Sequence, residues 1–528
     1  MRFPVSVVML VALARTATAQ PDPAPPAPEE PKDDKPGEPG TDKIDPVDPP
    51  KPEPKPIEVA PPVPPPVTAT PPIPPAGMEL VSKPPSLEGF RFGSYGRVLA
   101  GTDLRGGKPE SANVVAHGPR IVEDSYLELD FSYGVRTPRG MWLRPVITLA
   151  LDGTLFHDTG NFDAQPAIRN LFLEAQVSKR VTAWVGSRMY RGDDIYLFDY
   201  WPLDDLNTLG GGVLFRKPQS ETGGDVFELA AHAGVNRLEE PSEFQFQEID
   251  VADPEQGART IVQLNRQRLV ASASASYLMD NGIADPNFKF KVHGEVHVLP
   301  SGTRERSTDG TFEDLPYDTG YLVGAQAGTF GYAPRRHGFR RHLNVYARYA
   351  KGLAAFDELA PPTSVGKDLK TRRASELSFG ASGNFDHKLG NVMLGALSRR
   401  FVDADNNSTD FDDGWEYAVN VRPLANLGAD LFVGADVSYQ ARFPRGINPN
   451  TLRAEDPAVF QIAPMLVYSP MGPSGYDRPQ IRVVYRAAHL NEAARDLFVP
   501  DDPRREHRWT HFLGLQAEWW FNSSTYQR

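Results

Sequence analysis

Ionisable and aromatic side chains recur at every second position in several segments, and these rows hold the residues best suited to chemistry. In residues 124–133, Tyr126 and Glu128 share one face of an extended chain, and near the end of the chain Glu518 and Trp520 share another. A carboxylate accepts hydrogen bonds from hydroxyl donors, and an aromatic ring stacks on apolar surface. Such rows place ionisable and aromatic side chains together on one face of an extended strand.

A further row, His293, Glu295 and His297, contains residue types that bind metal ions. We expect no metal there, because ionisable side chains on the water-facing side of a strand explain the row. The chain has no Cys, which excludes disulfides and thiolate chemistry, and it has no Gly-x-Ser-x-Gly, His-Glu-x-x-His or phosphate-loop motif. We therefore predict neither an enzyme, such as a membrane lipase or protease, nor a cofactor.

The elements that carry these rows are strands with two unlike faces. In residues 288–298 one face is apolar and the other is charged. The apolar set is Phe288, Phe290, Val292, Val296 and Val298, and the charged set is Lys289, Lys291, His293, Glu295 and His297. The last strand alternates in the same way, with Trp519 and Phe521 facing out and Glu518 and Trp520 facing in. A barrel with lipid outside and water inside requires such faces.

Composition narrows the fold class. Of the 528 residues 40% are hydrophobic and the mean hydropathy is −0.41, which excludes a helical membrane bundle but not a barrel with a polar lumen. The net charge of −12 argues against nucleic acid as a partner. Residues 90–521 provide about 18 strands at roughly 24 residues per strand and turn. We predict an all-β fold, a transmembrane antiparallel β-barrel of about 18 strands.

The first 85 residues differ from the rest. Arg2, an apolar run and Ala17-Thr18-Ala19 are typical of a signal peptide over residues 1–19, so the mature chain is expected to begin at Gln20. Residues 20–85 are rich in proline and predict a disordered periplasmic linker, followed by the transmembrane barrel over residues 86–528. The linker is either a solvated spacer or a contact with the cell wall or a periplasmic partner. If it binds the cell wall, the whole protein could instead be a structural anchor that joins the membrane to the wall.

Several stretches in the predicted barrel resemble the maltoporin, or sugar porin, family. The first strand, Phe92-Gly93-Ser94-Tyr95-Gly96-Arg97, is similar to that family's opening pattern, and Trp184 to Trp201 is similar to its strand and inward-folded constriction loop. Further similar stretches are Asp124 to Glu128, Gln165 to Arg169, Tyr476 to Val483 and Gly514 to Phe521.

The resemblance implies an 18-stranded barrel in a Gram-negative outer membrane, a homotrimer, and passive diffusion of oligosaccharides such as maltodextrins. It also implies an aromatic strip that stacks on sugar rings and a polar track that bonds their hydroxyl groups. The strip is expected to contain Tyr95, Tyr126, Tyr476 and Trp520, with Phe162 reaching a neighbouring subunit. The track is expected to contain Arg97, Glu128, Arg169, Asp194 and Asp199, with Arg120 as a further candidate, and Trp201 stands where the family has a constriction tyrosine.

Some positions depart from the family. Gly192 stands where the constriction loop usually carries an arginine, and Tyr196 stands where histidine is common. The family's lumen aromatic has no aligned counterpart in residues 342–349, although the period puts Tyr346 and Arg348 on the inner face. These changes leave the preferred sugar open. A general or anion-selective porin without sugar specificity is the alternative.

Overall fold

The structure is a computed structural model. It describes residues 88–152, 155–156, 160, 165–217, 225–236, 246–251, 259–264, 266–279, 287–305, 311–331, 341–356, 362–406, 411–472 and 474–523. The predicted signal peptide and proline-rich linker, and Phe162, lie outside these residues.

Nearly every element is a strand. The first half contains β1 (Gly89–Thr102), β2 (Tyr126–Arg136), β3 (Trp142–Asp152), β4 (Gln165–Gln176), β5 (Val181–Arg191), β6 (Asp205–Arg216), β7 (Val226–Asn236), β8 (Phe246–Val251), β9 (Arg259–Leu264), β10 (Arg268–Met279) and β11 (Asn287–Leu299). The second half contains β12 (Gly302–Glu305), β13 (Phe312–Leu315), β14 (Asp318–Phe330), β15 (Arg341–Gly352), β16 (Ser375–His387), β17 (Gly390–Val402), β18 (Gly414–Asn426), β19 (Leu431–Pro444), β20 (Ala458–Tyr468), β21 (Gln480–Leu490) and β22 (Trp509–Phe521). The helices are short: η1 (Tyr196–Phe198), η3 (Leu353–Ala355), α1 (Glu492–Arg495) and α2 (Pro503–Glu506).

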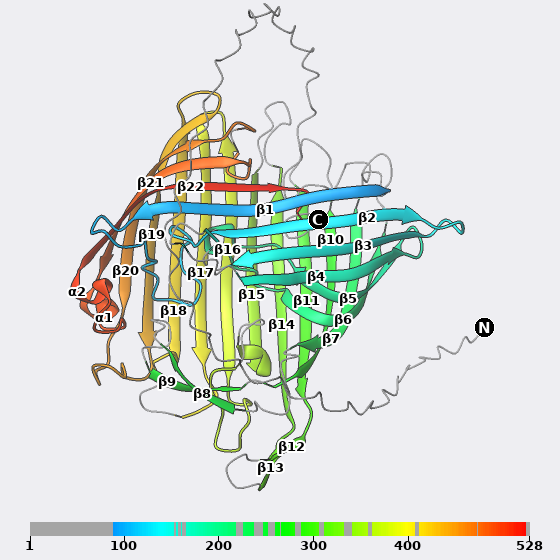
Figure 1. Cartoon of the computed structure of the whole chain (residues 1–528), viewed down its shortest axis with the longest axis horizontal. Helices are drawn as coiled ribbons and strands as arrows, with labels where there is room; N and C mark the ends of the chain where they lie inside the picture. Colours follow the sequence, from blue (N-terminus) through cyan, green and yellow to red (C-terminus); the bar gives the residue numbers. More distant parts are fainter. Residues whose placement is uncertain are drawn as a thin grey trace, which may run out of the picture. The chain divides into compact units, whose positions relative to one another are not determined.

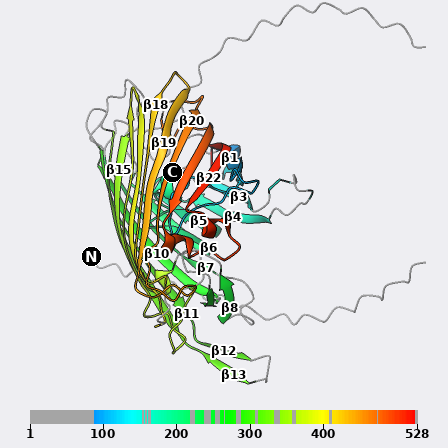
Figure 2. The ribbon, with the colours of Figure 1, turned by 90° about the vertical axis from the view of Figure 1, so that its left-hand side faces the viewer.

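Eighteen of the strands form one closed antiparallel sheet, which confirms the predicted fold class (Figure 1). Closure is made by β1 and β22, which pair from Ser94 with Phe521 to Thr102 with Leu513. The hairpins β8–β9 and β12–β13 form separate two-stranded sheets in long connections (Figure 1), and Figure 2 shows β12 and β13 from the side. In the described part of the chain no helix is long and apolar enough to cross a membrane.

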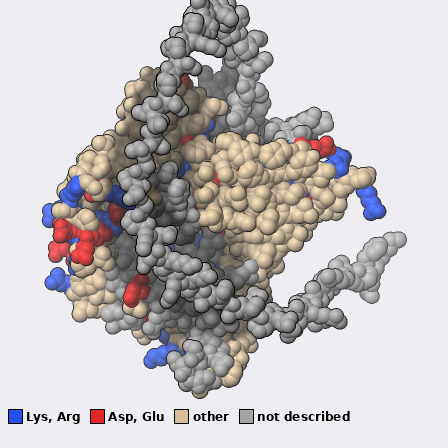
Figure 3. Space-filling model, viewed as in Figure 1, with Lys and Arg blue, Asp and Glu red and all other residues tan. Residues whose placement is uncertain are grey.

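The alternating pattern places apolar side chains outside and ionisable ones inside. On β11, Val292 is 57% exposed whereas His297 is completely buried. The outer surface over β1 to β5 shows few charged residues apart from its ends (Figure 3). A surface that faces hydrocarbon cannot hydrate charges, so this distribution is the one that a membrane-spanning barrel requires.

Parts of three connections come together with wall residues in one buried apolar cluster. They are residues 103–125 between β1 and β2, residues 192–204 between β5 and β6, and residues 491–508 between β21 and β22. The first two are joined where the Arg120 N–H donates to the Leu197 carbonyl at 3.0 Å. Residues 192–204, here called the constriction loop, thus pack inside the sheet and help to position the candidate site.

Candidate functional site

Strands β1, β2 and β22 form one wall of the site. Their register places Tyr95 beside Glu128 on one side and Trp520 on the other, all on the inner face. The Tyr95 and Tyr126 ring centroids are 6.0 Å apart. This wall therefore presents aromatic rings and a carboxylate side by side, as the sequence pattern predicted for Tyr126, Glu128 and Trp520.

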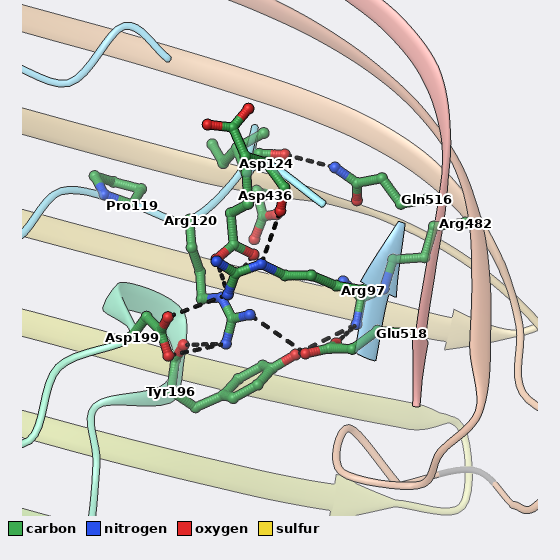
Figure 4. Close-up of polar contacts among 12 residues, drawn as sticks. Arg97, Pro119, Arg120, Asp124, Tyr196, Asp199, Asp436, Arg482, Gln516 and Glu518 are labelled. Carbon is green, nitrogen blue, oxygen red and sulfur yellow. Dashed lines mark hydrogen bonds and ion pairs between the residues drawn. The ribbon is translucent and has the colours of Figure 1, made fainter. Parts of the chain in front are cut away.

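The constriction loop approaches this wall through Asp199. Pairing between β4 and β5 ends at Leu171 and Ser187, whereas β5 and β6 stay paired up to Arg191 and Asp205. The end of β5 and the start of β6 therefore continue as a hairpin that is not paired with β4. Its tip contains η1, and Asp199 follows with a left-handed φ of 52°. The Asp199 carboxylate lies 3.3 Å from the Arg97 guanidinium (Figure 4).

Glu518 of β22 is the hub of the ion-pair network. Its carboxylate is 3.3 Å from the Arg120 guanidinium, 2.9 Å from that of Arg478 and 2.8 Å from that of Arg482. The Tyr196 hydroxyl donates to it at 2.6 Å (Figure 4). Arg120, which the resemblance gave only as a further candidate, also lies 3.7 Å from Asp199, so it links the wall to the loop.

Arg169 reaches the site through a β-bulge. The register between β3 and β4 shifts between Thr148 and Leu149, which leaves Arg169 as the extra residue on β4. Its guanidinium donates to the Tyr126 hydroxyl and forms an ion pair with Glu128. A bulge re-aims a side chain that regular pairing would direct elsewhere. Sequence similarity found Arg169, but only the bulge explains how it meets Glu128.

Aromatic rings extend the site toward the turn between β20 and β21. The Tyr196 ring centroid is 5.4 Å from that of Tyr476 and 6.1 Å from that of Trp520. The His342 ring lies 5.5 Å from Tyr476. Sequence reasoning did not include Tyr196 or His342 in the strip, because neither matches a family aromatic. His342 could have been found from the period of two, because it lies four residues before Tyr346 and therefore on the same inner face of β15.

Contacts around Gly192 explain why this position has no side chain where related loops usually carry an arginine. A Cβ atom on Gly192 would lie 1.6 Å from a carboxylate oxygen of Asp204, and Asp204 is held by the Lys291 ammonium at 2.6 Å. The Arg191 charge is neutralised by the Asp205 carboxylate, which lies 2.5 Å from it. The Arg191 guanidinium also stands 3.6 Å from the centroid of the buried Trp201 ring. The Arg191 guanidinium therefore covers one face of the Trp201 ring.

Asp194 and Asp199, the two predicted carboxylates of the constriction loop, lie outside the membrane-spanning strands, and their pKa values shift in opposite directions. Loss of hydration, followed by the negative charges of Asp199 and Asp193, raises the pKa of Asp194 to about 7. For Asp199 the loss of hydration also acts to raise the pKa, but the Arg120 and Arg97 guanidinium groups outweigh it and lower that pKa. Asp199 thus belongs to the ion-pair network.

The histidine row is an internal hydrogen-bonding group. The Glu295 carboxylate accepts from the His293 ring at 2.7 Å and lies 3.0 Å from the His297 ring. Within the described ranges, no group of three or more His, Asp or Glu side chains is arranged to hold a metal ion.

A family model and curated relatives both point to one family. The family model described as LamB porin matches residues 90–521. Maltoporins of Vibrio cholerae serotype O1 are 23% identical over 456 residues, which cover 81% of this chain and 93% to 94% of theirs. Among solved structures, OccAB4 of Acinetobacter baumannii matches 82% of this chain and 97% of its own, with 10% identity and a TM-score of 0.39. Wzi, a carbohydrate-binding β-barrel from Escherichia coli involved in capsule assembly, matches 80% and 83% of the two chains, with 10% identity and a TM-score of 0.36.

The family match covers all eighteen strands of the closed sheet, and the apolar outer face with its ionisable inner face suits a bilayer on one side and water on the other. The chain belongs to the LamB porin family and is an outer-membrane β-barrel porin.

Proposed function

We propose that this porin is selective for carbohydrates and lets neutral oligosaccharides such as maltodextrins diffuse passively through its lumen. The observation that carries the proposal is the inner wall of β1, β2 and β22, where Tyr95, Tyr126 and Trp520 stand beside Arg97 and Glu128. Arg97 is paired with Asp199, and Glu128 is paired with Arg169. The names of the maltoporin relatives support the same substrate class.

The wall suits the two kinds of surface on a sugar. A pyranose ring has apolar C–H faces, on which aromatic rings stack, and an equator of hydroxyl groups. Guanidinium and carboxylate groups exchange charge-assisted hydrogen bonds with these hydroxyls and so replace their lost hydration. Several weak sites in a row let a sugar enter without being trapped.

Charge compensation favours this function over an anion-selective porin. Anion pores use rings of Arg or Lys side chains to attract their ions. Around the constriction loop five cations each pair with a carboxylate instead, while Arg120, Arg478 and Arg482 share Glu518. The pairs are Arg97 with Asp199, Arg169 with Glu128, Arg191 with Asp205, Lys289 with Asp193, and Lys291 with Asp204.

The family resemblance supports a homotrimer, with Phe162 reaching the neighbouring subunit. The signal-peptide pattern around Ala17-Thr18-Ala19 supports a mature chain that starts at Gln20. Heat-modifiable migration in detergent gels and N-terminal sequencing of outer-membrane fractions test these proposals. Deletion of residues 21–80, followed by assays of sugar uptake and envelope integrity, tests whether the proline-rich segment contacts the cell wall or a periplasmic partner.

A planar bilayer titration tests the proposed function. The ion conductance should fall in a saturable way as maltooligosaccharides are added, and longer chains should block at lower concentration because they span more of the strip. A conductance that is insensitive to these sugars, together with a reversal potential that favours anions, would instead identify a general anion-selective porin.

A further inference from the structure

The inner wall of β15, β16 and β17 contains an apolar patch that a water-filled lumen does not explain. Tyr346, Leu397 and Met393 face inward there and are buried, and Gly380 and Gly395 lie between them with no side chain. Inward positions of a porin are normally polar, because they face water. We call this set the glycine patch.

The tip of the constriction loop fills the glycine patch. The side chains of Ile195 and Leu197 in the loop are no more than 1% exposed. A Cβ atom on Gly380 would lie 2.7 Å from the Ile195 Cδ1 atom, and one on Gly395 would lie 3.1 Å from the Leu197 Cβ atom. The two glycines therefore provide the space in which the loop tip rests.

The loop is also held at its other points. Its first part is tied to β11 by the ion pair of Lys289 with Asp193 at 2.5 Å. Its last part is tied to the wall by Lys291 with Asp204 at 2.6 Å and by the Arg348 guanidinium, which donates to the Tyr200 hydroxyl at 3.2 Å. A loop that is fixed along its length keeps Asp199 in one place relative to the wall of β1.

We propose that Gly380 and Gly395 are positioning residues that set the place of the constriction loop, so that the loop acts as a fixed size filter rather than as a gate. The two glycines touch no sugar in this proposal. They act through Ile195 and Leu197, which hold the loop tip and thereby keep Asp199 in contact with Arg97 of β1. The proposal concerns the dimensions of the channel, so it does not depend on which solute crosses it.

Cross-linking tests the contact directly, because the natural chain has no Cys. The Leu197 Cβ atom and the constructed Gly395 Cβ atom are 3.1 Å apart, close to the range of about 3.5 to 4.5 Å in disulfides. In the double variant Leu197→Cys/Gly395→Cys, oxidation of outer-membrane fractions should form this disulfide. The matched pair Leu197→Cys/Ala396→Cys should not cross-link, since Ala396 is the next residue on β17 and faces outward.

The cross-linked channel then separates a filter from a gate. Single-channel ion conductance should be the same before and after reduction, because the disulfide requires the loop to move by only a few tenths of an ångström. Absence of the disulfide in folded barrels would show that the tip does not rest on Gly395. A conductance that rises on reduction would show that the loop leaves the wall during function. Either result overturns the proposal, and neither measurement requires a sugar.

A substitution on the wall gives the functional consequence. Gly395→Val should displace the loop tip, break the contact of Asp199 with Arg97 and change the single-channel ion conductance. Ala396→Val is the control on the same strand and should leave that conductance unchanged. If Gly395→Val barrels do not fold, Ile195→Gly/Leu197→Gly empties the patch from the loop side and should admit larger sugars in liposome-swelling assays. Unchanged size exclusion in that variant would also refute the proposal.

Discussion

The Asp199 carboxylate at the tip of the constriction loop lies 3.3 Å from the Arg97 guanidinium on β1, although the two residues are 102 positions apart in the sequence. Asp199 is also 3.7 Å from Arg120, and Arg120 is 3.3 Å from Glu518. One continuous set of charge-assisted contacts therefore joins the loop to the wall that carries Tyr95 and Trp520.

Removal of the loop charge should weaken sugar binding without unfolding the barrel. In the double variant Asp194→Asn/Asp199→Asn, Arg97 loses its carboxylate partner in the loop, and the hydroxyl-bonding track is disrupted. Lumen side chains affect selectivity more than stability. Sugar titrations of channel conductance should show a weaker block, while detergent gels still show a heat-modifiable barrel. An equal block in the variant and the parent would exclude these carboxylates from the track.

Trp520 and its neighbour Trp519 should behave differently. Trp520 packs against the interior cluster, whereas Trp519 lies over Gly96 on the outer face and donates to the Ser94 hydroxyl at 3.1 Å. Stacking on one ring is worth about 0.5 to 1.5 kcal/mol, so Trp520→Ala should weaken sugar block by roughly 2-fold to 12-fold. Trp519→Ala is the matched control and should alter assembly or stability while block stays intact. The reverse pattern would contradict the inward placement of Trp520.

Ion selectivity should depend on pH through Asp194. Its raised pKa of about 7 means that this carboxyl is mostly protonated at pH 6 and mostly ionised at pH 8. Raising the pH therefore adds a negative charge to the loop and should shift the reversal potential toward cation selectivity. Asp194→Asn should lose this part of the shift, because an amide does not titrate. A full shift in that variant would assign the titration to another group.

Glu518 should be required for the stability of the barrel as well as for its site. It is 4% exposed and faces three guanidinium groups, so Glu518→Gln leaves buried cations without their carboxylate. Breaking a buried ion pair in this way costs about 3 to 5 kcal/mol. Urea unfolding of detergent-solubilised barrels should show the loss. Glu88→Gln is the control, since Glu88 pairs with Arg136 at the surface, and it should change the free energy of unfolding by less than about 1 kcal/mol.

The sequence by itself determined the fold and, in the strands that alternate clearly, the side of the wall on which each residue lies. The alternation in residues 288–298 and in the last strand predicted which side chains face in, and the structure confirms the closed sheet of eighteen strands. This was possible because the period of two is a local property of an extended chain and does not depend on which strand lies beside it. The candidate residues of the site came mainly from similarity to one family.

Only the tertiary structure decided which of these residues meet. The bulge that turns Arg169 toward Glu128, the Asp204 carboxylate that excludes a side chain at Gly192, and the Arg191 guanidinium that covers Trp201 are not visible in any local pattern. Each depends on a contact between segments that are brought together by closure of the sheet and by the path of the constriction loop inside it. Such contacts are set by the packing of residues far apart in the chain, so periodicity along one strand cannot predict them.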